Sequence, residues 1–253
     1  MQKQIVQSNY NLASPPEIGE VLADAAAYLP PKHLPEIRNA YEFAFSQHKG
    51  QLRESGHPYI THPLAVAQIV ARLELDHSAI SAALLHDVQE DCGVPNTEIA
   101  ELFGDDVASL VEGLTKLDNL PAHFGDNPDS QDAVQAQNYR KIFLAMAEDI
   151  RVVLVKLCDR LHNMRTLDPL PPEKQLRIAR ETMEIYAPLA NRLGIWQLKW
   201  ELEDLSFRYL YPERYQEISK RLELTREARE KYIAQCGQVL TDCLEIEKVS
   251  AVV

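Results

Sequence analysis

Long stretches rich in Ala, Leu, Glu, Gln and Arg, separated by short breaks that contain Pro or Gly, set the strongest limit on what this chain can fold into. These residues favour helices, and only 9 of the 253 residues are glycine. The sequence therefore predicts an all-α fold. Helices are expected between Pro16 and Pro30 and then over residues 34–48, 63–74, 77–90, 96–103, 104–117, 132–148, 151–167, 173–186, 188–193, 196–210 and 222–249.

Composition excludes several classes of protein. The N-terminus lacks a signal peptide, and no apolar run approaches the ~20 residues of a membrane span, so we expect a cytoplasmic protein. The four cysteines include no C-x-x-C pair, which disfavours a structural zinc site or a disulfide framework. The net charge of −12 argues against broad nucleic-acid binding.

One segment opposes the acidic balance of the chain. Four basic residues fall within 15 positions: Arg151, Lys156, Arg160 and Arg165. They are consistent with binding of a small anionic substrate, and equally with an ordinary solvated helix face.

The chain is expected to divide into three parts. Residues 1–16 are predicted to be a flexible lead, residues 17–221 a single helical domain, and residues 222–253 an amphipathic linker helix. Within the domain, residues 51–61 and the polar stretch 119–131 are predicted to be loops.

The segments 59–63, 86–91 and 159–163 concentrate the residues that carry chemistry. On a helix, His86 would share a face with Glu90, and Asp87 with Asp91. The apolar residues 82–85 that precede them predict a buried helix, and burying one His with three carboxylates is costly unless a cation neutralises them. The alternative is the polar end of a core helix.

Adding His62 and Asp159 to His86 and Asp87 makes a mixed nitrogen and oxygen set that suits Mn²⁺, Fe²⁺ or Zn²⁺. This H…HD…D order resembles the HD phosphohydrolases, in which a metal activates water. Glu90 lies one turn further on, where it can hold the water or accept its proton.

Asp159, Asn163 and Thr166 share a helix face, so they are expected to line one cavity. Alternatively, His162 and Asn163 merely satisfy buried backbone. The remaining histidines are given no role: His33, His48, His57, His77 and His123.

Five segments, 53–67, 82–91, 103–118, 137–167 and 173–215, resemble the hydrolase domain of the RelA/SpoT homologue family. The resemblance implies an all-helical HD-superfamily domain that hydrolyses the 3′-pyrophosphate of (p)ppGpp to GDP or GTP and pyrophosphate, with Mn²⁺, in stringent-response control. By position, it makes His62, His86, Asp87 and Asp159 the metal ligands. It makes Glu90 and Asp91 the catalytic acids, and Arg53, Asn163 and Thr166 the guanosine-pocket residues. Lys116, Lys156 and Arg160 are expected to neutralise phosphates.

The sequence also departs from the family pattern. Glu54 stands where a basic residue is usual, which is expected to weaken nucleotide binding, and Gln89 and Cys92 replace the usual Ile and Thr. Loop 119–131 is expected to gate the site. Helix 222–249 is expected to lead to a synthetase domain absent from this chain. Two alternatives stay open: an HD phosphohydrolase for another nucleotide, such as a dNTP or NADPH, and a silent nucleotide-binding regulatory module.

Overall fold

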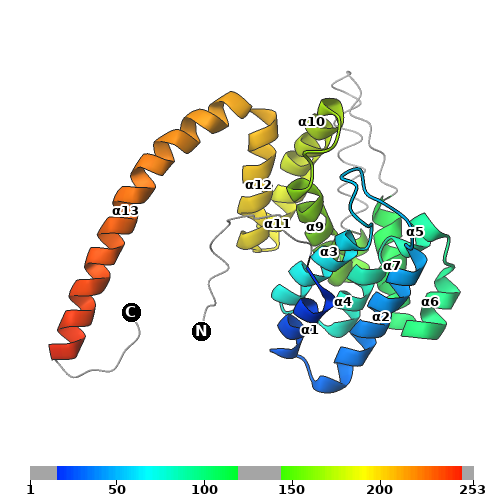
Figure 1. Cartoon of the computed structure of the whole chain (residues 1–253). Coiled ribbons are helices and arrows are strands. Elements are labelled where there is room, and N and C mark those ends of the chain that lie inside the picture. Colours follow the sequence, from blue (N-terminus) through cyan, green and yellow to red (C-terminus); the bar gives the residue numbers. More distant parts are fainter. Residues whose placement is uncertain (1–15, 119–143, 247–253) are drawn as a thin grey trace. The chain divides into compact units, whose positions relative to one another are not determined.

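The structure is a computed structural model that describes residues 16–118 and 144–246 (Figure 1). The predicted lead up to Pro15, the predicted loop 119–131, His123 and most of the predicted helix 132–148 lie outside the described residues. Within them, every element is helical apart from one isolated β-bridge between Leu52 and Pro58. The expectation of an all-α fold is confirmed.

The helices before residue 119 are α1 (Ile18–Ala26), η1 (Pro31–His33), α2 (Leu34–Gln47), α3 (Thr61–Arg72), α4 (His77–Leu85), α5 (Val88–Cys92), α6 (Asn96–Phe103) and α7 (Asp105–Asp118). Those after residue 149 are α9 (Ile150–Arg165), α10 (Pro172–Glu181), a π-helical turn η2 (Thr182–Tyr186), α11 (Ala187–Arg192), α12 (Trp196–Leu210) and α13 (Pro212–Ile246). Most predicted helices are therefore found within a few residues of their expected bounds.

The chain divides into two compact units, Met1–Ser206 and Phe207–Val253. The second contains α13, which begins at Pro212, before the expected start at residue 222, because Pro suits the first position of a helix. Just before α13, the rings of Phe207 at the end of α12 and of Tyr211 lie with their centroids 5.5 Å apart. The predicted boundary between residues 221 and 222 thus falls within one continuous helix, and the assignment of 222–253 as a linker stays a prediction.

Helix α4 forms the centre of the first unit. Every residue from Ser78 to Leu85 is buried, and the helix packs against α2, α3, α7 and α9 (Figure 1). Asp76 caps its N-terminus by accepting a hydrogen bond from the Ala79 backbone at 2.8 Å, which satisfies a donor that has no partner within the helix. The buried C-terminal end of α4 is therefore held firmly in the core.

The prediction of one continuous helix over 77–90 is wrong. Helix α4 ends at Leu85 and α5 begins at Val88, with His86 and Asp87 in the turn between them. Asp87 has φ −96° and ψ −8°, between the helical and turn regions. Because α5 is a separate helix, Glu90 and Asp91 are exposed. The expected burial of three carboxylates together with His86 is therefore wrong as well.

Helix α9 is the second core helix. Asp149 caps it by accepting a hydrogen bond from the Arg151 backbone at 2.8 Å. Its buried residues include the polar side chains Lys156, Asp159 and His162. Since α9 packs against α3 and α4, these polar groups face the turn that carries His86 and Asp87.

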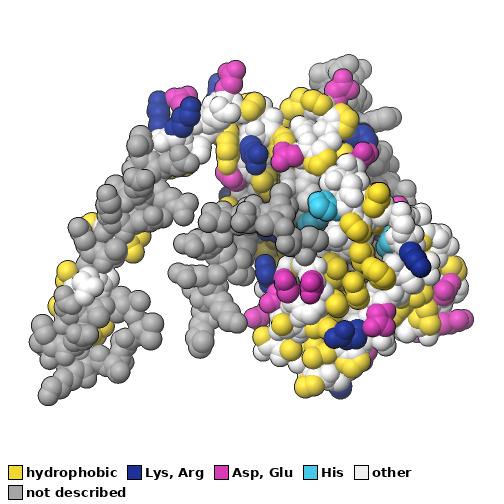
Figure 2. Space-filling model, viewed as in Figure 1, with side chains coloured by type: hydrophobic (Ala, Val, Ile, Leu, Met, Phe, Trp, Pro, Cys, Tyr) yellow, Lys and Arg dark blue, Asp and Glu magenta, His cyan; other side chains and the backbone are white. Residues whose placement is uncertain are grey.

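On the face shown in Figure 2, Lys and Arg side chains are scattered among acidic ones and form no continuous basic patch. The described surface in this view therefore agrees with the acidic balance of the sequence.

Candidate active site

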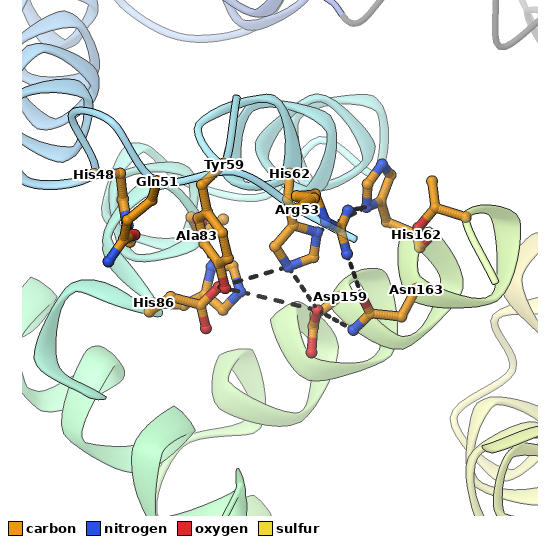
Figure 3. A network of polar contacts seen from close by, with 12 residues as sticks. His48, Gln51, Arg53, Tyr59, His62, Ala83, His86, Asp159, His162 and Asn163 are labelled. Atoms are coloured by element: carbon orange, nitrogen blue, oxygen red, sulfur yellow. Dashed lines mark hydrogen bonds and ion pairs between the residues drawn. The ribbon is translucent and has the colours of Figure 1, made fainter. Parts of the chain in front are cut away.

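Three parts of the chain bring the four predicted metal ligands together, and Figure 3 shows three of them, His62, His86 and Asp159. His62 lies in the first turn of α3, His86 and Asp87 in the turn between α4 and α5, and Asp159 in α9. His62 Nε2 lies 3.1 Å from Asp159 Oδ1 and 3.6 Å from Asp87 Oδ2. His86 Nε2 lies 3.9 Å and 3.1 Å from the same two oxygens. Two nitrogens and two oxygens thus alternate around a small ring.

The dimensions and chemistry of this ring fit a divalent cation. Bonds of about 2.1 Å place neighbouring ligand atoms about 3.0–3.4 Å apart, close to the observed distances. His86 Nδ1 lies 2.8 Å from the carbonyl oxygen of Ala83, which only accepts, so Nδ1 carries a proton and Nε2 is the nitrogen that can bind a metal. That Nε2 is buried and has no hydrogen-bond partner. His62, His86 and Asp159 thus form a buried candidate metal site, with Asp87 beside it.

The charges of the ring call for a cation. Burial alone would lower the pKa of His86, but the carboxylates of Asp87 and Asp159 raise it to about 9. Burial alone would raise the pKa of Asp87, yet His86 lowers it well below its usual value. Both acids therefore stay ionised, and a divalent cation would replace the proton that they hold on His86.

Three further side chains hold the two carboxylates in place. The hydroxyl of Tyr59 donates to Asp87 Oδ2 at 2.8 Å. Lys156 Nζ donates to Asp159 Oδ2 at 2.8 Å, and Asn163 Nδ2 donates to Asp159 Oδ1 at 2.7 Å. Sequence reasoning gave Tyr59 no role, although Tyr59 belongs to the segment 59–63 that the sequence singled out.

A cavity of about 290 Å³ opens beside the ring. The predicted site residues that line it are Arg53, His62, Asp87, Glu90, Asp159, Asn163 and Thr166, together with the expected phosphate-binding residues Lys156 and Arg160. Glu54 also lines it, while Leu167, Pro169, Leu170 and Ile178 form an apolar wall. The nucleotide-pocket residues expected from the sequence therefore do converge.

Three predicted residues are not among those that line this cavity: His86, which lies behind it in the ring, Asp91 and Lys116. Asp91 is exposed, but its carboxylate, after burial and Asp87, helps to raise the pKa of Tyr59 well above its usual range. Lys116 pairs with Glu112 on the surface of α7 at 2.9 Å. We therefore assign Lys116 no part in the site.

Arg53 is carried by a tight turn in the predicted loop 51–61. Its backbone N–H donates to the His57 carbonyl at 2.9 Å, and Gly56 closes the turn with φ +81°, a conformation that favours glycine. The guanidinium points across to α9, where Nη2 donates to Asn163 Oδ1 at 3.1 Å and Nη1 lies 3.3 Å from His162 Nδ1. The turn thus positions Arg53 at the edge of the ring of candidate metal ligands.

The basic segment of α9 is not a solvated face, and its residues divide between ion pairs away from the cavity and the cavity lining. Arg151 pairs with Asp76, Asp106 and Asp149, and Arg165 pairs with Glu201. Arg160 pairs with Glu181 and lies 4.2 Å over the ring of Tyr186. Its buried Nε has no hydrogen-bond partner, so a buried donor is left in a side chain that lines the cavity.

A second group of possible ligands, His33, Glu36 and His77, is less suitable for a metal. The two imidazole rings are stacked with centroids 3.8 Å apart and an angle of 24° between their planes. Because a ring nitrogen binds a metal in the plane of its ring, nearly parallel stacked rings do not converge on one ion. We therefore assign His33 and His77 no role in metal binding.

The all-helical fold and the candidate metal site of His62, His86 and Asp159 are typical of a helical domain of the HD type. Consistent with this, the family model described as "HD domain" matches residues 40–196. The chain belongs to the HD domain family. No helix in the described part combines the length and the apolar composition that a membrane crossing requires.

Within this family, the similar proteins belong to the RelA/SpoT group. The chain is 55% identical over 204 residues to a probable guanosine-3′,5′-bis(diphosphate) 3′-pyrophosphohydrolase of Synechocystis, covering 81% of this chain and 26% of the relative. It is 52% identical over 206 residues to the bifunctional (p)ppGpp synthase/hydrolase SpoT of Escherichia coli, covering 81% and 28%. The resemblance seen in the sequence is confirmed, and the chain spans about a quarter of the length of these relatives.

A solved structure is also similar. It comes from work titled "A metazoan ortholog of SpoT hydrolyzes ppGpp and plays a role in starvation responses". The TM-score is 0.51 at 25% identity, with 72% of this chain and 96% of that chain covered. The likeness spans nearly the whole of that chain and supports the helical fold of the first unit.

Proposed function

We propose that this chain hydrolyses the 3′-pyrophosphate of (p)ppGpp to GDP or GTP and pyrophosphate. The observation that carries the proposal is the alternating ring of His62, His86, Asp87 and Asp159, which opens onto the cavity. Names of relatives that refer to guanosine-3′,5′-bis(diphosphate) 3′-pyrophosphohydrolase support the choice of substrate.

For the metal we propose Mn²⁺, which suits a mixed set of imidazole and carboxylate ligands. When bound, it would lower the pKa of a water molecule and neutralise phosphoryl oxygens. His86 can bind it without tautomeric change, because the Ala83 carbonyl already holds the proton on Nδ1. The ligand roles of all four residues belong to this proposal.

Glu90 is the proposed proton acceptor for the attacking water, since it lines the cavity beside Asp87, and Asp91 assists it. The water oxygen attacks the inner phosphorus of the 3′-pyrophosphate. The bond from this phosphorus to the ribose 3′ oxygen breaks, and that oxygen takes a proton. Pyrophosphate and the 5′-diphosphate or triphosphate nucleoside are released.

The remaining residues of the cavity bind and orient the substrate. Arg53, Asn163 and Thr166 are proposed to hold the guanosine, next to the apolar wall. Arg160 offers its unpartnered buried Nε, and Lys156 adds a second cation near Asp159. These two neutralise the phosphates, whose negative charge is otherwise disfavoured beside a cluster of carboxylates.

The test is release of pyrophosphate and GDP from ppGpp with Mn²⁺, with an EDTA control. Asp87→Ala is expected to abolish turnover, while Asp105→Ala, an exposed acid in the first turn of α7, serves as the matched control and retains it. Turnover by the Asp87 variant in metal-replete buffer would contradict the ligand assignment. A panel with dNTPs and NADPH separates the proposed substrate from other nucleotides.

One observation favours a second function, that of a silent nucleotide-binding regulatory module. Glu54 places a carboxylate at the lining of the cavity, where it repels a polyanionic substrate. Metal-dependent binding of ppGpp without product would support this alternative. We also propose that a (p)ppGpp synthetase domain accompanies this domain, as the printed name of the E. coli relative implies for that protein.

A further inference from the structure

His62 has both ring nitrogens engaged. Its Nε2 faces the carboxylates of Asp159 and Asp87. Its Nδ1 lies 2.7 Å from Nδ1 of His162, and both residues are buried. At this distance one of the two Nδ1 atoms donates and the other accepts. The direction of this hydrogen bond decides whether Nε2 of His62 carries a proton or a lone pair.

Arg53 decides the direction. A guanidinium only donates, and its Nη1 lies 3.3 Å from the same Nδ1 of His162. That nitrogen therefore carries a lone pair, and His62 Nδ1 carries the proton. It follows that His62 Nε2 has its lone pair toward the ring, as a metal ligand requires.

The side chains form a closed circuit (Figure 3). Arg53 also donates to Asn163, and Asn163 donates to Asp159, which faces His62 again. The tautomer of His86, in contrast, is set by a backbone carbonyl. The tautomer of His86 is thus fixed by the main chain, whereas the tautomer of His62 is fixed by a side-chain network that reaches the cavity.

We propose that His162 is a positioning residue, which holds the proton of His62 on Nδ1 and so presents Nε2 to the metal. This inference rests on the proposed metal centre. It gives His162 a role beyond satisfying backbone groups, and it explains how Arg53, a residue of the nucleotide pocket, supports the metal centre without touching the ion.

The first test compares two variants of His162 by calorimetric titration with Mn²⁺, without nucleotide. Asn places an acceptor oxygen near the position of Nδ1, whereas Leu cannot accept a hydrogen bond. His162→Leu is expected to weaken Mn²⁺ binding by about 10- to 100-fold, the usual effect of losing a partner behind a ligand. His162→Asn is expected to stay close to the unmodified protein. Equal loss in both variants, or none in the Leu variant, would overturn the proposal.

His77→Leu is the control, since His77 lies at the start of α4 and does not line the cavity. Its Mn²⁺ affinity is expected to be unchanged. The metal centre is tested separately by the unmodified protein and by Asp87→Ala. If the unmodified protein does not bind Mn²⁺, the proposed function fails; if it binds and His162→Leu binds equally well, only the present inference fails.

The second test reads the tautomers directly. Long-range ¹H–¹⁵N spectra of ¹⁵N-histidine-labelled protein distinguish a proton on Nδ1 from one on Nε2. We expect His62 protonated on Nδ1 and His162 on Nε2. The reverse pair of tautomers would refute the proposal. If His162→Leu does not fold, this measurement on the unmodified protein is sufficient to test the proposal.

Discussion

Tyr59→Phe offers a clean test of how the metal centre is held. The hydroxyl of Tyr59 donates to Asp87 Oδ2 at 2.8 Å. The ring itself stacks on His48, with centroids 4.7 Å apart, and meets His62 edge-on at 6.1 Å. Phe keeps both ring contacts and removes only the hydroxyl. Any effect therefore reports the hydrogen bond to the carboxylate.

The expected magnitude follows from the charge on Asp87. Burial and the neighbouring carboxylates keep the pKa of Tyr59 above its usual value, so the hydroxyl remains a donor. A hydrogen bond to a charged group contributes about 1.5–3 kcal/mol. If the lost hydrogen-bond free energy had served to orient the Asp87 carboxylate for the metal, the variant binds Mn²⁺ about 10- to 100-fold more weakly, since 1.4 kcal/mol corresponds to a factor of ten.

The assay is calorimetric titration with Mn²⁺, together with the rate of pyrophosphate release from ppGpp. The matched control is Tyr28→Phe, which also loses a hydroxyl hydrogen bond, here to the Leu75 carbonyl at 2.7 Å. Its Mn²⁺ affinity is expected to be unchanged. A folded Tyr59→Phe variant with unaltered Mn²⁺ affinity would refute the reasoning.

Three other predictions concern charge and stability. Glu54→Lys replaces a repulsive charge at the cavity with an attractive one, a change of two charges. At about 0.5–1 kcal/mol per exposed charge, the KM for ppGpp should fall roughly 5- to 30-fold, and Glu54→Gln should give an intermediate value. A higher KM in the Lys variant would count against the proposed binding site. Glu201→Ala removes the buried partner of Arg165, which it contacts at 2.6 and 2.8 Å, so urea denaturation should show a loss of about 3 kcal/mol, and a loss near zero would show that the pair contributes nothing. Burial and nearby carboxylates raise the pKa of Tyr28 from 10.0 to about 12; because the folded state holds this proton more tightly, its stabilisation is present below pH 10 and is lost between pH 10 and 12. Tyr28→Phe should remove that part of the alkaline loss, and identical pH profiles for the two proteins would contradict it.

Local features of the sequence were sufficient for most of the helices and for the choice of candidate metal ligands. Helix propensity and the breaks at Pro and Gly act over a few residues, so the bounds of α2, α6 and α9 were predicted within a few positions. The H…HD…D order identified His62, His86, Asp87 and Asp159 because it is a property of residue types along the chain. The resemblance to the RelA/SpoT family added the residues of the cavity.

The break between α4 and α5 was decided by tertiary structure. His86 and Asp87 are compatible with a helix in local sequence, so the helical spacing of residues 77–90 concealed the turn. In the folded chain, that turn lies where the buried end of α4 meets α3 and α9. There Asp87 accepts a hydrogen bond from the hydroxyl of Tyr59. Glu90 and Asp91, beyond the break, become exposed.

The partners that orient the ligands were also decided by tertiary structure. Tyr59 meets Asp87 across 28 positions, and His62 meets His162 across 100. No helical spacing relates residues so far apart, since only the packing of α3 against α4 and α9 brings them within hydrogen-bonding distance. The sequence by itself therefore determined which residues can bind a metal, whereas the tertiary structure decided which nitrogen and which oxygen each one presents.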